Sequence, residues 1–192
     1  FFVQNNPAIL SLFGIGSLQR IGTNFYVFNN LKLATIAGPT GLERIDGNFT
    51  LQSNPKLKDV EGLNSLQKID QFLAIFGNWS LQNVHGFQSL DSLGGYLSIS
   101  NNDSLASLSG FEKLAQIGGS MTVSTNKSLK FLFGNINELK FLGQDLTIES
   151  NDALLDLSGF EKLKTVPGNF LLTKNKSLKT GFSPAEQPEI FG

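Results

Sequence analysis

Residues 97–111 read LSISNNDSLASLSGF, and the same arrangement of residue types returns along almost the whole chain. The most regular member of the arrangement is an asparagine that recurs every 24 residues, with a single step of 25. The series consists of Asn6, Asn30, Asn54, Asn78, Asn102, Asn126, Asn151 and Asn175. A fixed period of this length is typical of a solenoid, in which like coils stack and bury their inner faces against one another.

Apolar residues and a glycine hold fixed places between successive asparagines. Counted from the asparagine, an apolar residue stands at +3, +6, +12 and +15 in nearly every coil, and the coil closes with an alternating pair such as Leu97 and Ile99. The glycine stands at +8, as Gly14, Gly38, Gly62, Gly86, Gly110, Gly134 and Gly159. The extra residue of the long coil lies between Gly134 and Leu139, because the pattern is in phase on both sides.

These spacings predict strands and turns. The alternating pair indicates a short, half-buried strand, whereas apolar residues three apart do not match the 3.6-residue period of an α-helix. The glycine predicts a positive φ angle or a close approach to the neighbouring coil. The asparagine is expected at a turn, where it adopts the left-handed conformation and its amide joins a ladder of stacked amides.

The chain is therefore expected to be an all-β solenoid, a β-helix of about eight coils with parallel stacked strands. Strands about 4.8 Å apart give a rod on the order of 40 Å long. The 192 residues form one predicted domain, 1–192. Its repeats are 7–30, 31–54, 55–78, 79–102, 103–126, 127–151 and 152–175, with partial coils at 1–6 and 176–192.

The string L-x-I-x-x-N-x-x-L-x-x-L-x-G-F, clearest in residues 97–111, resembles the receptor L-domain branch of leucine-rich-repeat proteins. Two residues separate the asparagine from the following leucine, as in L-domains, whereas the ordinary leucine-rich repeat has one. The resemblance implies a right-handed β-helix of leucine-rich coils. Relatives include receptor ectodomains, surface adhesins and fungal wall proteins, which implies an extracellular or cell-surface location and a recognition or adhesion role.

Composition bounds the possible functions. The chain has no stretch of 18 apolar residues, so no membrane span is expected. Its basic residues are scattered and its net charge is −1, which argues against a nucleic-acid partner. It has no cysteine, which excludes disulfides and thiol chemistry.

No enzyme, cofactor or metal site is expected. The single histidine, His85, occupies a variable position of the repeat, and no cluster of His, Asp and Glu has metal-ligand spacing. Lyases and hydrolases built as β-helices array charged residues on one sheet face. Here the outward strand positions, four and two residues before each asparagine, hold one acid, Glu149, and no base.

The same outward positions contain the candidate recognition residues. The early coils carry aromatic side chains at or near these positions, namely Phe2, Tyr26, Phe28, Phe76 and Trp79. Outward aromatic side chains on a sheet predict a contact patch for a protein or glycan partner at a cell surface. A row of hydroxyl side chains (Thr50, Ser98, Thr122 and Thr147), interrupted by Ala74, makes an ice-binding solenoid a minor alternative.

The ends of the chain support a second hypothesis. Phe1, Phe2 and Val3 fall within a predicted strand, and the chain finishes with Ile190, Phe191 and a glycine. The 6 residues through Asn6 and the 17 residues after Asn175 together fall one short of a coil. These ends could join head to tail into a homopolymeric filament. The same residue count is also expected if the sequence is an excerpt from a longer array, or if the chain is a monomer that caps itself.

Five N-x-S/T triplets are candidates for glycosylation: Asn48, Asn78, Asn102, Asn126 and Asn175. The last four coincide with the repeated asparagine, where the serine two residues later belongs to the repeat. Asn48 lies outside that series at the start of a predicted strand, and its side chain is expected to face solvent.

Overall fold

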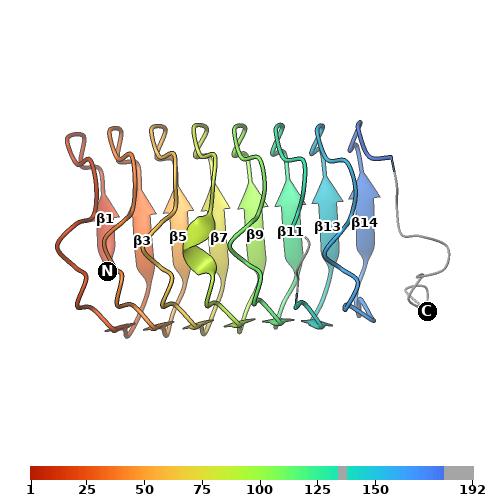
Figure 1. Ribbon diagram of the computed structural model, residues 1–192, viewed down its shortest axis with the longest axis horizontal. Coiled ribbons are helices and arrows are strands. Elements are labelled where there is room, and N and C mark those ends of the chain that lie inside the picture. Colours follow the sequence, from red (N-terminus) through yellow and green to blue (C-terminus); the bar gives the residue numbers. More distant parts are fainter. Residues whose placement is uncertain (134–137, 180–192) are drawn as a thin grey trace.

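The alternating segment before each repeated asparagine forms a strand. In the computed structural model, which describes residues 1–133 and 138–179, these strands make one parallel sheet, sheet A (Figure 1). Its members in spatial order are β1 (Phe2–Gln4), β3 (Phe25–Phe28), β5 (Phe49–Gln52), β7 (Leu73–Phe76), β9 (Leu97–Ser100), β11 (Met121–Ser124), β13 (Leu146–Glu149) and β14 (Phe170–Thr173). The chain is thus an all-β parallel solenoid of about seven turns.

A second parallel sheet, sheet B, is built from two-residue strands on another side of each coil. They are β2 (Arg20–Ile21), β4 (Arg44–Ile45), β6 (Lys68–Ile69), β8 (Ser92–Leu93), β10 (Gln116–Ile117) and β12 (Phe141–Leu142). On the remaining side, the residues that the structure describes form only isolated bridges, such as the one between Thr35 and Asp59. In the described part of the chain the only helical segment is a 3₁₀ turn, η1 (His85–Phe87), so the sequence argument against an α-helix in each coil is confirmed.

The register reveals where the long coil gains its residue. Ser107 bridges to Phe131, an offset of 24, whereas Gln116 pairs with Phe141, an offset of 25. The insertion therefore falls between Phe131 and Phe141, which agrees with the position inferred from the repeat.

The core is a set of columns in which like residues stack from coil to coil. In the coils between the two ends, the inward positions of sheet A and the apolar residues at +3 are fully buried, for example Phe25, Val27 and Leu105. The rings of Phe25 and Phe49 stack with centroids 4.9 Å apart, because parallel in-register strands place identical side chains directly above one another. This burial of apolar area is the main stabilising contribution to the fold.

A ladder of buried asparagine amides runs beside the apolar columns. Asn102 is fully buried, and its Oδ1 accepts hydrogen bonds from both the backbone N and the Nδ2 of Asn78, at 3.1 and 3.4 Å. Its Nδ2 donates to the carbonyl oxygens of Ile75 and Ser100, at 2.9 and 3.0 Å. The contacts between successive asparagines and the bond to a carbonyl of the preceding coil recur from Asn30 to Asn151, so the predicted ladder is confirmed.

The sequence predicted that the ladder asparagine adopts the left-handed conformation. In the structure it is the residue before the asparagine that does so. These residues have φ near +55°, and they include Asn101, Thr125, Ser150 and Lys174. The turn is set by coil stacking, since threonine and lysine have no intrinsic preference for this conformation. The ladder asparagine is retained for its amide, which satisfies backbone groups of the neighbouring coil.

The glycine at +8 serves the two purposes that the sequence predicted. At Gly110 φ is +116°, and a Cβ would lie 2.3 Å from the carbonyl oxygen of Val84. At Gly38 only the close approach applies, because a Cβ there would lie 2.0 Å from the carbonyl oxygen of Leu12. Gly134 lies outside the described residues.

The loss of stability on replacing a ladder asparagine should depend strongly on whether that asparagine is buried inside the ladder or exposed at its end. Replacing Asn102 by Ala leaves the buried Asn78 N–H without its partner and removes the side-chain hydrogen bond to the Ile75 carbonyl, which should lower the free energy of unfolding by about 3 kcal/mol. Asn6→Ala is the matched control: Asn6 is an exposed end of the ladder, and its loss should cost about 1 kcal/mol or less. Equal losses for the two variants in urea unfolding would contradict the role assigned to the ladder.

Candidate recognition surfaces

Three of the five predicted patch residues meet on the outer face of sheet A. Phe2 and Tyr26 are register partners on β1 and β3, and their ring centroids lie 5.9 Å apart. The Tyr26 and Phe28 centroids lie 6.3 Å apart on the same strand. Phe2 is 61% exposed, whereas Tyr26 and Phe28 are half-buried. Strand pairing fixes the backbone of all three, so they form a rigid aromatic cluster.

The other two predicted residues lie farther along the solenoid. Phe76 on β7 is separated from Phe28 by Gln52 in the same row of the sheet. Trp79 follows in the turn after the ladder asparagine and is 61% exposed. Neither ring pairs with another aromatic ring among the described residues. We therefore use "aromatic cluster" for Phe2, Tyr26 and Phe28 alone.

The outward positions of sheet A are less uniformly exposed than the alternation suggested. Thr50 and Ala74 point outward but are only 3% and 5% exposed. The Tyr26 hydroxyl on β3 donates a hydrogen bond to Gln52 Oε1 on β5 at 3.2 Å, so the tyrosine reaches across to the strand that carries Thr50. The hydroxyl row of Thr50, Ser98, Thr122 and Thr147 is consequently not an even exposed row, because its first member is covered.

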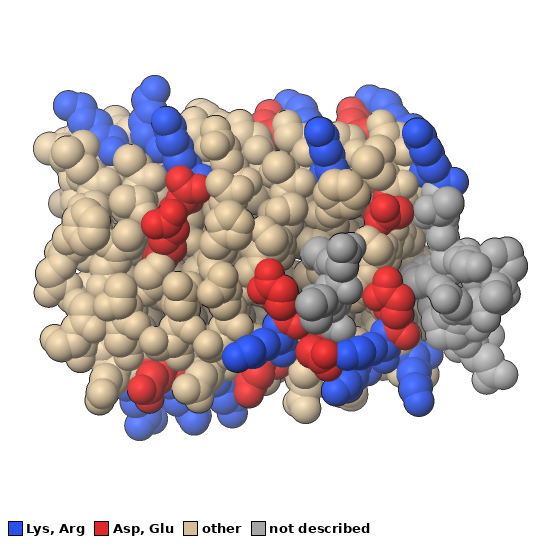
Figure 2. Space-filling model, in the orientation of Figure 1, with Lys and Arg blue, Asp and Glu red and all other residues tan. Residues whose placement is uncertain are grey.

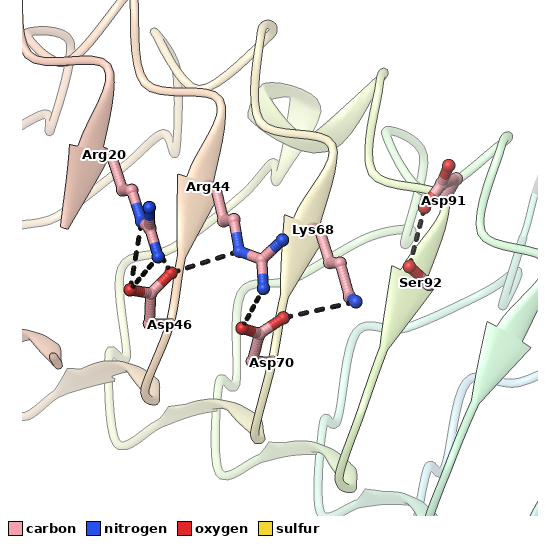
Figure 3. A network of polar contacts seen from close by, with 7 residues as sticks. All are labelled: Arg20, Arg44, Asp46, Lys68, Asp70, Asp91 and Ser92. Atoms are coloured by element: carbon pink, nitrogen blue, oxygen red, sulfur yellow. Dashed lines mark hydrogen bonds and ion pairs between the residues drawn. The ribbon is translucent and has the colours of Figure 1, made fainter. Parts of the chain in front are cut away.

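Sheet B carries a charged network that the repeat analysis missed. Arg20, Arg44 and Lys68 stack on β2, β4 and β6, and an aspartate lies between each successive pair (Figure 3). Arg20 Nε and Nη2 donate to Asp46 at 2.8–3.0 Å, Arg44 donates to both Asp46 and Asp70, and Lys68 Nζ lies 3.4 Å from Asp70. The sequence signal is the repeated triplet R-I-D, K-I-D.

The network of Arg20, Asp46, Arg44, Asp70 and Lys68, which we call the charge ladder, has two effects. The Arg20 hydrogen bonds hold the pKa of the Asp46 carboxyl below its ordinary value, and the hydrogen bond to Asp70 raises the pKa of Arg44. The network also links the first coils across sheet B. It ends at Lys68, since Ser92 on the next strand donates to its own neighbour Asp91 (Figure 3).

Basic and acidic side chains are distributed differently over the face shown in Figure 2. Most Lys and Arg lie along the two long edges, whereas several Asp and Glu side chains lie between them. Several lysines pair with a carboxylate of the neighbouring coil, for example Lys127 with Asp103 at 2.6 Å and Lys174 with Glu149 at 2.8 Å. Glu149, the single acid of the outward rows, is therefore part of an ion pair.

The terminal residues are only partly described. The Phe1 ring stacks on Phe25 with centroids 4.9 Å apart, and Val3 packs against the core. Ile190 and Phe191, the predicted C-terminal half of a head-to-tail junction, lie outside the described residues. The assembly hypothesis stays a prediction.

The glycosylation candidates differ in accessibility. Asn78, Asn102 and Asn126 are fully buried in the ladder, and Asn175 is half-buried with its Nδ2 donating to the Ile148 carbonyl at 2.9 Å. A glycan on any of these amides displaces a ladder hydrogen bond. Asn48 is half-buried, and its Nδ2 donates to no described residue, although its Oδ1 accepts from the Phe72 N–H at 3.3 Å.

Within the described residues there is no group of three or more His, Cys, Asp and Glu side chains placed to hold a metal ion. His85 is exposed in η1. The described part of the chain also contains no helix with the length and hydrophobicity needed to cross a membrane. No family model matches the chain, and no curated protein or solved structure matches it either.

The charge ladder predicts a specific dependence on pH. Because the pKa of Asp46 is lowered on folding, its contribution to stability is present above the ordinary pKa of 3.8 and disappears as the pH falls through the lowered value. Asp46→Asn should be slightly less stable than the wild type at neutral pH, and the melting temperatures of the two should converge as the pH falls below 3.8. A gap that is constant or widens toward low pH would contradict this assignment.

Proposed function

We propose that the chain is a right-handed leucine-rich solenoid of the receptor L-domain kind that acts outside the cell as a non-catalytic recognition or adhesion module. The support is the repeat motif together with an all-β parallel solenoid whose inner columns contain leucine, isoleucine and phenylalanine. Its partner is a protein or a glycan at a cell surface.

The observation that carries this proposal is the aromatic cluster of Phe2, Tyr26 and Phe28. Large rings held on paired strands offer contact area at little cost in conformational entropy. Exposed aromatic groups on a rigid surface are typical centres of binding energy in protein interfaces. Phe76 lies in the same row of sheet A as Phe28, and Trp79 is exposed in the turn that follows β7.

The cluster is tested with a substitution and a matched control in the same outward row. Labelled, multimerised protein is applied to intact cells of the source organism and saturable binding is measured. Phe28→Asp should weaken binding by about tenfold or more, since a charge is placed at the contact centre. Ser124→Asp adds the same charge in the same row of β11 and should leave binding unchanged. Absence of saturable binding, or equal binding by Phe28→Asp and wild type, would sink the proposal.

The extracellular location makes a separate prediction at Asn48. If the chain is secreted through a eukaryotic pathway, a glycan is expected there, because the Asn48 amide nitrogen is unengaged and the ladder amides are buried. Mass spectra before and after treatment with an N-glycanase should differ by one glycan. Asn48→Gln should remove that difference, and no mass change in the wild type would dispose of the idea.

Two alternatives from the sequence remain open to direct tests. Head-to-tail assembly through Phe1, Phe2, Val3, Ile190 and Phe191 predicts filaments, and monodisperse particles of 20.9 kDa in light scattering would contradict it. Ice binding requires thermal hysteresis, which the covered position of Thr50 disfavours.

A further inference from the structure

A groove lies at the corner where sheet B leads into sheet A, across the coils that contain β9 and β11. Its volume is about 520 Å³. The floor consists of two glycine pairs, 94–95 and 118–119. In the preceding coils the place of Gly94 is taken by Asp46 and Asp70, so the groove begins where the charge ladder ends.

Backbone packing keeps this floor free of side chains. A Cβ on Gly94 would lie 2.0 Å from the carbonyl oxygen of Asp70, and a Cβ on Gly118 would lie 2.2 Å from the carbonyl oxygen of Gly94. Larger residues cannot enter without displacing the adjacent coil. The hollow is therefore a fixed feature of the stacked backbone.

One wall of the groove is an aromatic ring with an uncovered face. Tyr96 stacks on Phe72 with centroids 4.4 Å apart and an interplanar angle of 9°, so Phe72 covers one face of the ring. The next residue in this column is Ser120, whose side chain is too short to cover the other face. Tyr96 is 41% exposed and lines the groove together with Ser120.

The remaining wall offers neutral hydrogen-bonding groups. Ser98 and Thr122 are register partners on β9 and β11, and their hydroxyls make no hydrogen bond within the described residues. Gln144 Oε1 accepts a hydrogen bond from the Ser120 hydroxyl at 3.3 Å, and its amide N–H groups donate to no described residue. Of the described residues that line the groove, none is charged.

We propose that this groove binds a neutral saccharide, with one sugar ring stacked on the free face of Tyr96. A sugar ring combines an apolar face with a rim of hydroxyl groups, and the groove pairs an aromatic face with the Ser98 and Thr122 hydroxyls and the Gln144 amide. A site without charge does not compensate a phosphate or carboxylate for its desolvation. The inference goes beyond the proposed function, because it uses a different surface from the aromatic cluster.

The test is an NMR titration of the full chain with three neutral probes, laminarihexaose, hexa-N-acetylchitohexaose and mannohexaose. We expect saturable shifts centred on Tyr96, Gly119 and Thr122 with at least one probe. Tyr96→Ala should weaken that binding about tenfold, whereas Tyr96→Phe keeps the ring and should stay within about threefold. Phe13→Ala removes an aromatic side chain that is 74% exposed and lies outside the groove, and it should bind like the wild type.

Ser120→Tyr provides a second, independent variant. It extends the Phe72–Tyr96 stack by one ring and covers the free face of Tyr96, so it should abolish binding in a folded chain even if Tyr96→Ala fails to fold. Unchanged affinity in folded Ser120→Tyr, or no saturable shift with any probe at millimolar concentration, would overturn the proposal. Phe28→Asp should leave this titration unaltered, so the proposal for the groove and the proposal for the aromatic cluster can be contradicted independently.

Discussion

The hydrogen bond between stacked asparagine amides is the constraint on which the rest of the molecule depends. Each buried amide satisfies the backbone N–H of the preceding asparagine and a carbonyl oxygen in the preceding coil, and several, such as Asn102, also donate to a carbonyl oxygen in their own coil. Buried backbone groups are costly when unpaired, so a coil cannot shift along its neighbour without losing these bonds. The ladder therefore fixes the register of sheet A, and the apolar columns follow from that register.

Because the register is fixed, side chains at equivalent positions of successive coils stack into columns on the surface. The residue type within a surface column changes from coil to coil. Where successive members are large or charged, they form continuous structures: the Arg20–Asp46–Arg44 network and the rings of Phe2 and Tyr26. Where a large member precedes a small one, a hollow forms, as between Tyr96 and Ser120. The candidate sites arise from these transitions, while the core stays nearly invariant.

Much of the fold could be predicted because a repeated sequence requires a repeated backbone. The period revealed the strands, the amide ladder and the close approach at Gly110. The left-handed conformation of Thr125 and Lys174 could not be predicted, since coil stacking imposes it against local preference. The burial of Thr50 and the ion pair between Arg20 and Asp46 could not be predicted either. Both depend on side chains that reach diagonally from one coil to the next, and the spacing of residues within one coil does not encode such contacts. Three of the five residues of the predicted contact patch form the aromatic cluster, whereas the groove was not predicted.

Native-state hydrogen exchange tests the central claim most directly. The backbone N–H groups of Asn54, Asn78 and Asn102 donate to ladder amides, and their loss of protection should require global unfolding. The account predicts that these N–H groups exchange among the slowest in the chain, with a denaturant dependence equal to that of global unfolding. Exchange through local fluctuations that are independent of denaturant, at rates like those of the turn residues, would contradict it.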